Sequence, residues 1–212
     1  MFRVPHGTGR MLETEKDVGI LGMEYELKYG ASPGAQAAIR EELRDFTEIT
    51  METAYYDTPD GALAARKITL RCRKENGVAV CTVKTPAGGN SRGEWEIEWD
   101  DIHTAVPKLC KLGGPEELLS LTKGALVQVC GARFTRLAKR IDLPNAVAEL
   151  ALDRGVLLGG GKEAPLCEIE VELKSGSRQE TAEYAAALAA RYGLQPEPKS
   201  KFRRALALAK GE

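Results

Sequence analysis

Histidine and closely spaced cysteine pairs, which often build catalytic dyads and zinc sites, are scarce in this chain. Only two histidines and five cysteines occur among 212 residues, and no Cys-x-x-Cys pair is present. An odd number of cysteines without such a pair argues against a disulfide framework and a zinc site. Reduced thiols and a cytoplasmic location fit this pattern best. Neither His6 nor His103 lies in the charged strands described below, so histidine catalysis is not expected.

Long apolar runs, a P-loop and a net charge of either sign are also missing. No run of about eighteen apolar residues occurs, and the first residues lack the apolar centre of a signal peptide, so no membrane span is expected. Without a Gly-x-x-x-x-Gly-Lys-Ser/Thr motif, a P-loop enzyme is excluded. The net charge of -1 provides no general attraction to nucleic acid or acidic membranes. We expect a loose N-terminal extension, residues 1–22, followed by a single domain, residues 23–212.

Alternation of polar and apolar residues recurs along the chain and is typical of β-strands. The Asn76-Gly77 pair indicates a tight hairpin turn between two of these strands. The Gly159–Gly161 run is expected to be a turn and not a phosphate loop. About eight strands are predicted, over residues 23–29, 54–57, 68–74, 78–85, 93–100, 131–143, 147–153 and 166–174.

Helical segments are predicted between and after these strands. Ser32 as an N-cap and Pro33 at the first position predict a helix running to about residue 46. Further helices are expected over residues 105–112, 116–121 and 177–192, and after Ser200. Mostly antiparallel strands with inserted helices indicate an α+β fold. Eight strands also suffice for a closed eight-stranded antiparallel β-barrel with helices packed outside.

Charged side chains share one face of most predicted strands, and acidic and basic strands are separate. The acidic faces carry Glu24 and Glu26, with Lys28; Glu94, Glu96 and Glu98; and Glu168, Glu170 and Glu172. The basic strands carry Arg71 and Arg73, Lys84, and Arg136. A solvated sheet face is the ordinary interpretation of such alternation. However, solvated faces mix charges of both signs, whereas glutamates roughly 7 Å apart on neighbouring strands repel unless cations offset them.

Closing the sheet with these faces inward offers a chemical reason for the pattern. The carboxylates would form a cluster of hard oxygen ligands suited to Mg²⁺ or Mn²⁺. The arginines and lysines would form a cradle for phosphate oxygens. A polyphosphate bridging the two clusters would neutralise both, which is the arrangement that phosphoryl transfer requires.

Taken in order, these residues resemble the CYTH family of triphosphate tunnel metalloenzymes, most of all its bacterial inorganic triphosphatase branch. The N-terminal signature Glu-x-Glu-x-Lys is present as Glu24 to Lys28. The resemblance continues through the segments 56–59, 70–73, 82–85, 92–96, 134–136, 149–155, 167–173 and 199–201. Members of that branch often carry a C-terminal helical CHAD domain, and this chain is expected to end too soon to contain one.

The resemblance implies a tunnel that binds triphosphate with a divalent metal, two ions being possible. It implies a first metal site formed by Glu24, Glu26, Glu168 and Glu170. It assigns Asp153, with Glu94 or Glu96, to a second metal that orients water. It implies phosphate binding by Lys28, Arg71, Arg73, Lys84, Arg136 and Lys201. Lys28 is also a candidate for proton transfer, the alternative being a simple phosphate clamp.

Three functions stay open at this point. The first is hydrolysis of inorganic triphosphate or a small triphosphate ester; the others are adenylate cyclisation, known in the family, and non-catalytic polyphosphate binding. A pure anion binder would be penalised by the carboxylates. A cyclase needs a purine pocket, yet aromatic residues make up only 6%. Strand parity places Tyr25, Trp95 and Trp99 outside, with Phe134 as the main exception and Tyr55 or Tyr56 as a lesser one.

Overall fold

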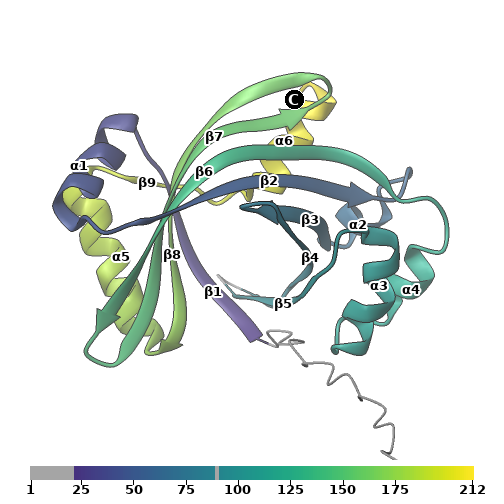
Figure 1. The fold of residues 1–212 in the computed structure, drawn as a ribbon, viewed down its shortest axis with the longest axis horizontal. Coiled ribbons are helices and arrows are strands. Elements are labelled where there is room, and N and C mark those ends of the chain that lie inside the picture. Colours follow the sequence, from purple (N-terminus) through teal and green to yellow (C-terminus); the bar gives the residue numbers. More distant parts are fainter. Residues whose placement is uncertain (1–21, 89–90) are drawn as a thin grey trace, which may run out of the picture.

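The computed structural model describes residues 22–88 and 91–212, and its main feature is a closed antiparallel barrel (Figure 1). The strands follow the order β5-β4-β3-β2-β6-β7-β8-β1, and β1 pairs with β5 to close the sheet. Their bounds are β1 Gly22–Gly30, β2 Thr47–Asp57, β3 Thr69–Glu75, β4 Val78–Pro86, β5 Ser91–Glu98, β6 Val127–Leu143, β7 Ala146–Gly159 and β8 Lys162–Gly176. The predicted eight-stranded barrel is confirmed. A two-residue strand, β9 (Gln195–Pro196), extends β1.

The predicted N-terminal extension, residues 1–22, lies outside the described residues except for Gly22, which begins β1. That residues 23–212 form a single domain stays a prediction. The Asn76–Gly77 turn has positive φ angles of 49° and 90°, as a tight hairpin between twisted strands requires. The Gly159–Gly161 run joins β7 to β8 as a turn.

Several strands are longer than the alternation predicted. β2 begins at Thr47 instead of residue 54, and β7 continues to Gly159 instead of residue 153. After the exposed Arg154, β7 is apolar from Gly155 to Gly159, with Leu157 buried against the last helix. A strand that is covered on both sides shows no polar alternation, so the pattern cannot reveal where it ends.

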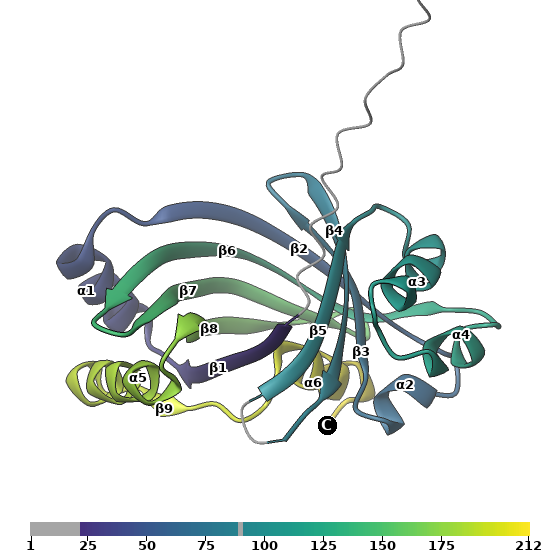
Figure 2. The same ribbon diagram turned by 90° about the horizontal axis from the view of Figure 1, so that it is seen from below.

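The helices cover the barrel in groups (Figures 1 and 2). Their bounds are α1 Pro33–Leu43, α2 Ala62–Ala65, α3 Ile102–Lys111, α4 Glu117–Leu121, α5 Arg178–Tyr192 and α6 Lys201–Lys210. Side chains from α1 and α5 join an apolar cluster on β1, β7 and β8, and those from α2, α3 and α4 join one on β3 and β4. The apolar faces of the alternating strands are thus buried under helices, while the charged faces point inward.

Two helices differ from the sequence-based expectation. α1 ends at Leu43, short of residue 46, because Arg44 and Asp45 take left-handed φ angles of 48° and 47°. The short helix α2 was not predicted. Asp57, at the end of β2, accepts hydrogen bonds from the backbone N–H groups of Leu63 and Ala64 at 2.8 and 3.0 Å. This capping satisfies donors that the start of a helix leaves free.

Helix α6 has a special place because it packs against side chains that also face the barrel lumen. Phe202 and Ala205 join Met51, Tyr55 and Phe134 in one buried apolar cluster. The Tyr55 and Phe202 rings lie 5.2 Å apart between centroids. Helix α6 therefore seals part of the lumen and carries Lys201, its first residue, into the interior.

We predict that Gly155→Ala strongly destabilises the barrel. A Cβ at this position would lie 2.2 Å from the Arg133 carbonyl oxygen and 2.5 Å from the Phe134 Cα, both backbone atoms. Relieving that overlap would force β6 and β7 apart and lower the free energy of unfolding by about 3 kcal/mol. In α1, Gly34→Ala is the control: the nearest atom, Ser32 Oγ, is 3.8 Å away, and an increase of about 0.5 kcal/mol is expected. Urea unfolding measures both, and equal midpoints for the two variants would contradict the prediction.

Candidate functional site

The barrel lumen contains a cavity of about 280 Å³ lined mainly by charged side chains. Among them are the predicted residues Glu24, Glu26, Lys28, Arg71, Arg73, Lys84, Glu94, Glu96, Arg136, Glu170 and Lys201. Asp153 and Glu168 do not line this cavity, although they belong to the predicted metal ligands; both are fully buried beside it. The barrel thus brings together side chains that lie far apart in the sequence.

The closure of the barrel places the acidic strands side by side. β8, β1 and β5 are consecutive around the sheet, and β4 and β3 follow β5. Glu26 lies directly opposite Glu172, and Lys28 opposite Glu170, on β1 and β8. The two carboxylates of the first pair, Glu26 and Glu172, repel each other unless a cation lies between them. The acidic strands and the basic strands predicted from the sequence therefore line different parts of the wall of one cavity.

Ion pairs across the lumen offset part of this charge. The Lys84 Nζ lies 2.6 Å from Glu24 Oε1 and 3.2 Å from Glu94 Oε1. Arg71 Nη2 lies 3.5 Å from Glu94 Oε1, and Lys28 Nζ lies 3.4 Å from Glu26 Oε1. The longer contacts leave much of the hydrogen-bonding capacity of these groups unused.

Three buried atoms around the cavity have no hydrogen-bond partner among the described residues: Glu24 Oε2, Arg71 Nε and Arg73 Nε. Leaving such an atom unpaired costs about 1–3 kcal/mol. Burial, followed by the neighbouring charge of Arg71, lowers the pKa of Arg73. For Arg71, burial acts to lower the pKa, but the neighbouring acidic groups, Glu94 first, together outweigh it and raise the pKa. The cavity therefore offers free donors for an anion and a free acceptor for a cation.

Beside the cavity, a second group of carboxylates is tightly paired. Carboxylate oxygens of Asp153, Glu168 and Glu170 lie within 4.8 Å of one another. Arg136 donates to Asp153 through Nε and Nη2, at 2.8 and 2.7 Å. Lys201 Nζ lies 2.7 Å from Asp153 Oδ2 and 2.8 Å from Glu170 Oε1, and it also contacts Glu168. Cations thus occupy the centre of the acidic group.

The pKa values follow from this crowding. Burial acts to raise the pKa of Glu170, but Lys201, Arg136 and Lys28 outweigh it and hold the pKa well below its usual range. Burial raises the pKa of Glu168, and the charge of Glu170 adds to it. For Lys201, burial acts to lower the pKa, but the carboxylates, Asp153 first, raise it. The positive charge of Lys201 therefore helps to keep the carboxylates of this cluster ionised.

Gln36 of α1, which was not predicted as a site residue, holds the wall behind this cluster. Its Nε2 donates to the backbone carbonyls of Asp153 and Glu168, both at 3.0 Å. Arg204, one helical turn after Lys201, contacts Glu168. The spacing of three from Lys201 on a predicted helix could have identified Arg204. No sequence signal marked Gln36, because its partners are backbone atoms.

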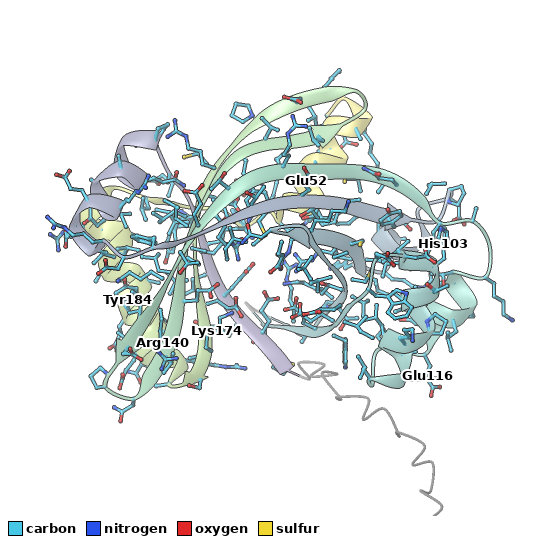
Figure 3. The ribbon with its side chains drawn as sticks, viewed as in Figure 1. Glu52, His103, Glu116, Arg140, Lys174 and Tyr184 are labelled. Atoms are coloured by element: carbon cyan, nitrogen blue, oxygen red, sulfur yellow. The ribbon has the colours of Figure 1, made fainter. Side chains whose placement is uncertain are left out.

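Five further charged residues of the lumen wall were not assigned a role from the sequence: Glu75, Arg92, Glu149, Glu172 and Lys174. Glu149 lies opposite Glu172 on β7 and β8, and Lys174 Nζ lies 2.8 Å from Glu172 Oε1; Lys174 is labelled in Figure 3. Strand parity had already placed Glu172 on an acidic face, and it could have found Glu149 and Lys174, which alternate with Asp153 and Glu170. His103 of α3, labelled in Figure 3, is exposed, and no histidine of residues 22–88 and 91–212 lines the cavity.

The residues present fit a hard divalent cation such as Mg²⁺ or Mn²⁺. Their donors are carboxylate oxygens, the ligand type these ions prefer. Glu24 Oε2 is a buried acceptor with no partner, next to Glu26 on the same face of β1. At the tightly paired cluster, a metal would have to replace Lys201 between Asp153, Glu168 and Glu170. The acceptor at Glu24 is therefore the easier one to reach.

Comparison with known proteins agrees with this geometry. A model of the CYTH domain matches residues 22–206. The chain belongs to the CYTH domain family. It is 30% identical over 178 residues to an inorganic triphosphatase of Haemophilus influenzae, covering 80% of this chain and 50% of that protein. The chain thus spans about half the length of this curated relative.

Solved structures share the CYTH fold at low sequence identity. A protein from Hippeastrum, described as a proposed adenylyl cyclase with a dominant triphosphatase activity, superposes with a TM-score of 0.61 at 18% identity, over 90% of this chain and 97% of its own. A Pyrococcus horikoshii protein gives 0.58 at 23% identity, over 88% and 99%. These likenesses support the barrel fold. Within the described part of the chain, no helix combines the length and apolar character needed to cross a membrane.

We predict that Lys201→Gln destabilises the protein in a pH-dependent way. The variant leaves Asp153, Glu168 and Glu170 with one cation fewer, which should lower the free energy of unfolding at pH 7 by about 3 kcal/mol. Without Lys201 the folded carboxylates bind protons more readily than the unfolded ones, so the variant gains stability as the pH falls. In wild type the depressed pKa of Glu170 keeps the contribution of this carboxylate to stability in place from pH 7 to pH 5, because it is lost only at lower pH. The difference in the free energy of unfolding between wild type and Lys201→Gln should therefore become smaller from pH 7 to pH 5.

Denaturant unfolding with and without millimolar Mg²⁺ measures both effects. Mg²⁺ should stabilise Lys201→Gln more than wild type, because it can replace the missing charge and binds only the folded state. The control is Arg133→Gln, whose exposed pair with Glu163 at 3.0 Å should change stability by no more than about 0.5 kcal/mol. A gap that stays constant with pH would contradict the prediction.

Proposed function

We propose that this CYTH domain hydrolyses inorganic triphosphate, or a small triphosphate ester, with Mg²⁺ or Mn²⁺, and releases phosphate. The observation that carries the proposal is the set of unpaired buried atoms around one cavity: two guanidinium donors, from Arg71 and Arg73, and one carboxylate acceptor, from Glu24. A triphosphate with its divalent cation supplies a partner for each of them.

Phosphate binding is assigned to the cations that line the cavity. Arg71 and Arg73 lie two residues apart on β3, so both guanidinium groups face the lumen. Lys84 on β4, Lys28 on β1, Arg136 on β6 and Lys201 on α6 approach from other walls. Cations on several sides can hold a chain of phosphates in an extended form and stabilise charge that moves onto the leaving oxygen.

The carboxylates hold the metal and handle protons in this proposal. Glu24, Glu26 and Glu170 would bind the cation, with Asp153 and Glu168 behind them; when bound, the ion neutralises phosphate oxygens. Glu94 or Glu96 would orient a water molecule and accept its proton. The water oxygen attacks the terminal phosphorus, the bond to the bridging oxygen breaks, and the leaving diphosphate keeps the electron pair. Whether Lys28 transfers a proton or only holds phosphate stays open.

A purine site, which a cyclase would need, has little support in the cavity. Its aromatic lining residues are Tyr55, Phe134 and Phe202. All three are buried in the apolar cluster around α6. Trp95 packs in the outer cluster with α3, as predicted. The interior rings therefore leave little free face for stacking on a base.

Relatives and composition support the finer parts of the proposal. The Haemophilus influenzae relative is named an inorganic triphosphatase, and the Hippeastrum protein is reported with a dominant triphosphatase activity. All five cysteines are free, in line with the proposed cytoplasmic location. We propose a small-molecule triphosphate, and not a nucleic acid, as the binding partner.

The activity test measures phosphate release from tripolyphosphate and from ATP with Mg²⁺ or Mn²⁺, together with an assay for cyclic AMP. Tripolyphosphate should be the better substrate, and excess chelator should abolish turnover. Glu24→Gln should lower kcat/KM by about a hundred-fold or more, because the unpaired acceptor that faces the cation loses its charge. Full turnover in excess chelator, or cyclic AMP as the main product from ATP, would contradict the proposal.

A second prediction separates the roles of the lumen cations from folding. Arg73→Ala should lower kcat/KM by about a hundred-fold while its Tm stays within about 4 °C of wild type, which corresponds to about 1 kcal/mol. The reason is that burial and Arg71 already lower the pKa of Arg73, so removing its charge relieves repulsion. Arg133→Ala, on the exposed part of β6, is the matched control and should keep full activity. An Arg73→Ala protein that is folded and fully active would contradict the role in phosphate binding.

A further inference from the structure

A second hollow of about 820 Å³ lies next to the catalytic cavity. It is formed where the end of β4 meets α2 and α6, which Figure 2 shows at the same end of the barrel. Thr69, Lys84, Arg92, Ser200 and Phe202 line both this hollow and the cavity in the lumen. The hollow is therefore an outer vestibule, and what enters the lumen at this end passes it.

The vestibule carries a surplus of positive charge. Lys67, Arg92, Arg203 and Lys210 line it, and none of them forms an ion pair with a carboxylate of the described residues. The cations of the lumen, by contrast, are mostly paired with glutamate or aspartate. Unpaired cations gathered around one concave surface attract a polyanion.

The two acidic residues of the vestibule offset only part of this positive charge. Asp57 is buried, and its oxygens accept hydrogen bonds from the backbone N–H groups of Thr58, Leu63 and Ala64 at 2.7, 2.8 and 3.0 Å. Asp60 accepts a hydrogen bond from the Thr58 hydroxyl at 2.6 Å. Both carboxylates shape the start of α2 and keep their charge, so the four cations outnumber the two carboxylates and leave a net positive charge around the hollow.

The lining also argues against an organic group. Phe202 is the single aromatic residue that lines the vestibule among the described residues, and it is buried against Tyr55. A nucleoside would find no aromatic face there to stack on. A further run of phosphates, by contrast, would meet cations just after α2, on β5 and on α6.

We propose that the vestibule binds the phosphates of a linear inorganic polyphosphate that extend beyond the three held in the lumen. The proposal rests on the proposed function, since it places a triphosphate in the lumen. It predicts that longer chains bind more tightly than tripolyphosphate, and that the vestibule cations cause the difference. Because these contacts are electrostatic and exposed, the added affinity should decrease as salt increases.

Calorimetric titration of the full chain with tripolyphosphate and with size-fractionated polyphosphate, with Mg²⁺ present, tests the proposal by binding alone. The variant is Lys67→Gly/Arg203→Gln. Lys67 has a left-handed φ of 59°, where glycine is favoured, so the first substitution removes charge without backbone strain. The control, Lys111→Gln/Lys123→Gln, removes the same charge from exposed sites at the end of α3 and after α4.

The vestibule variant should lose about ten-fold in affinity for long polyphosphate, as expected for two lost exposed ion contacts, and keep its affinity for tripolyphosphate. The control should behave as wild type with both ligands. The proposal is overturned if wild type binds both ligands equally, or if the variant loses affinity for both alike. Phosphate release from tripolyphosphate is measured separately, so a protein that binds but does not hydrolyse refutes the proposed function and leaves the binding comparison valid.

Discussion

Repulsion between like charges enclosed in a barrel is the constraint on which the rest of this structure depends. β8, β1 and β5 are neighbours, and each turns carboxylates toward the lumen. Such an arrangement can fold only if cations approach from elsewhere, and β3, β4, β6 and α6 provide them. The outer helices bury the apolar side of the same strands. Because side chains alternate between the two faces of a strand, the strands that bury apolar residues under the helices turn their charged residues into the lumen.

The carboxylates of the lumen are not all paired with cations equally closely. We assign the closely paired ones to stability and the others to ligand binding. Around Asp153 and Glu168, cations are bound closely, and the backbone behind is held by Gln36. Around Glu24, Arg71 and Arg73, buried atoms lack partners. A protein gains no stability from leaving such atoms unpaired. The tightly paired group stabilises the wall and α6, whereas the unpaired group retains free energy that a ligand can recover, which is why phosphate and metal binding are proposed there.

Strand parity in the sequence was sufficient to predict which side chains face the lumen, because a shift of one residue would turn every carboxylate of β1 or β8 outward. Parity could not predict which of these side chains reach the cavity and which stay buried beside it. Glu168 and Glu170 share one face of β8, yet Glu168 is fully buried beside Arg204 while Glu170 reaches the cavity. Nor could it reveal Gln36, which binds backbone atoms, or the far end of β7, where both faces are apolar. Position along the lumen depends on where helices pack, and the alternation carries no information on that.

Helix α6 shows how this missing information bears on the chemistry. From the sequence, Lys201 was expected to bind phosphate. In the structure it begins α6 and lies buried among three carboxylates, which raise its pKa. Phe202 anchors the same helix in the apolar cluster. A phosphate or metal that draws Lys201 away from Asp153 and Glu168 must therefore compete with its ion pairs to them. The residue that sequence reasoning assigned to phosphate thus also balances the charge of the carboxylates behind the cavity, because α6 places its ammonium group between them.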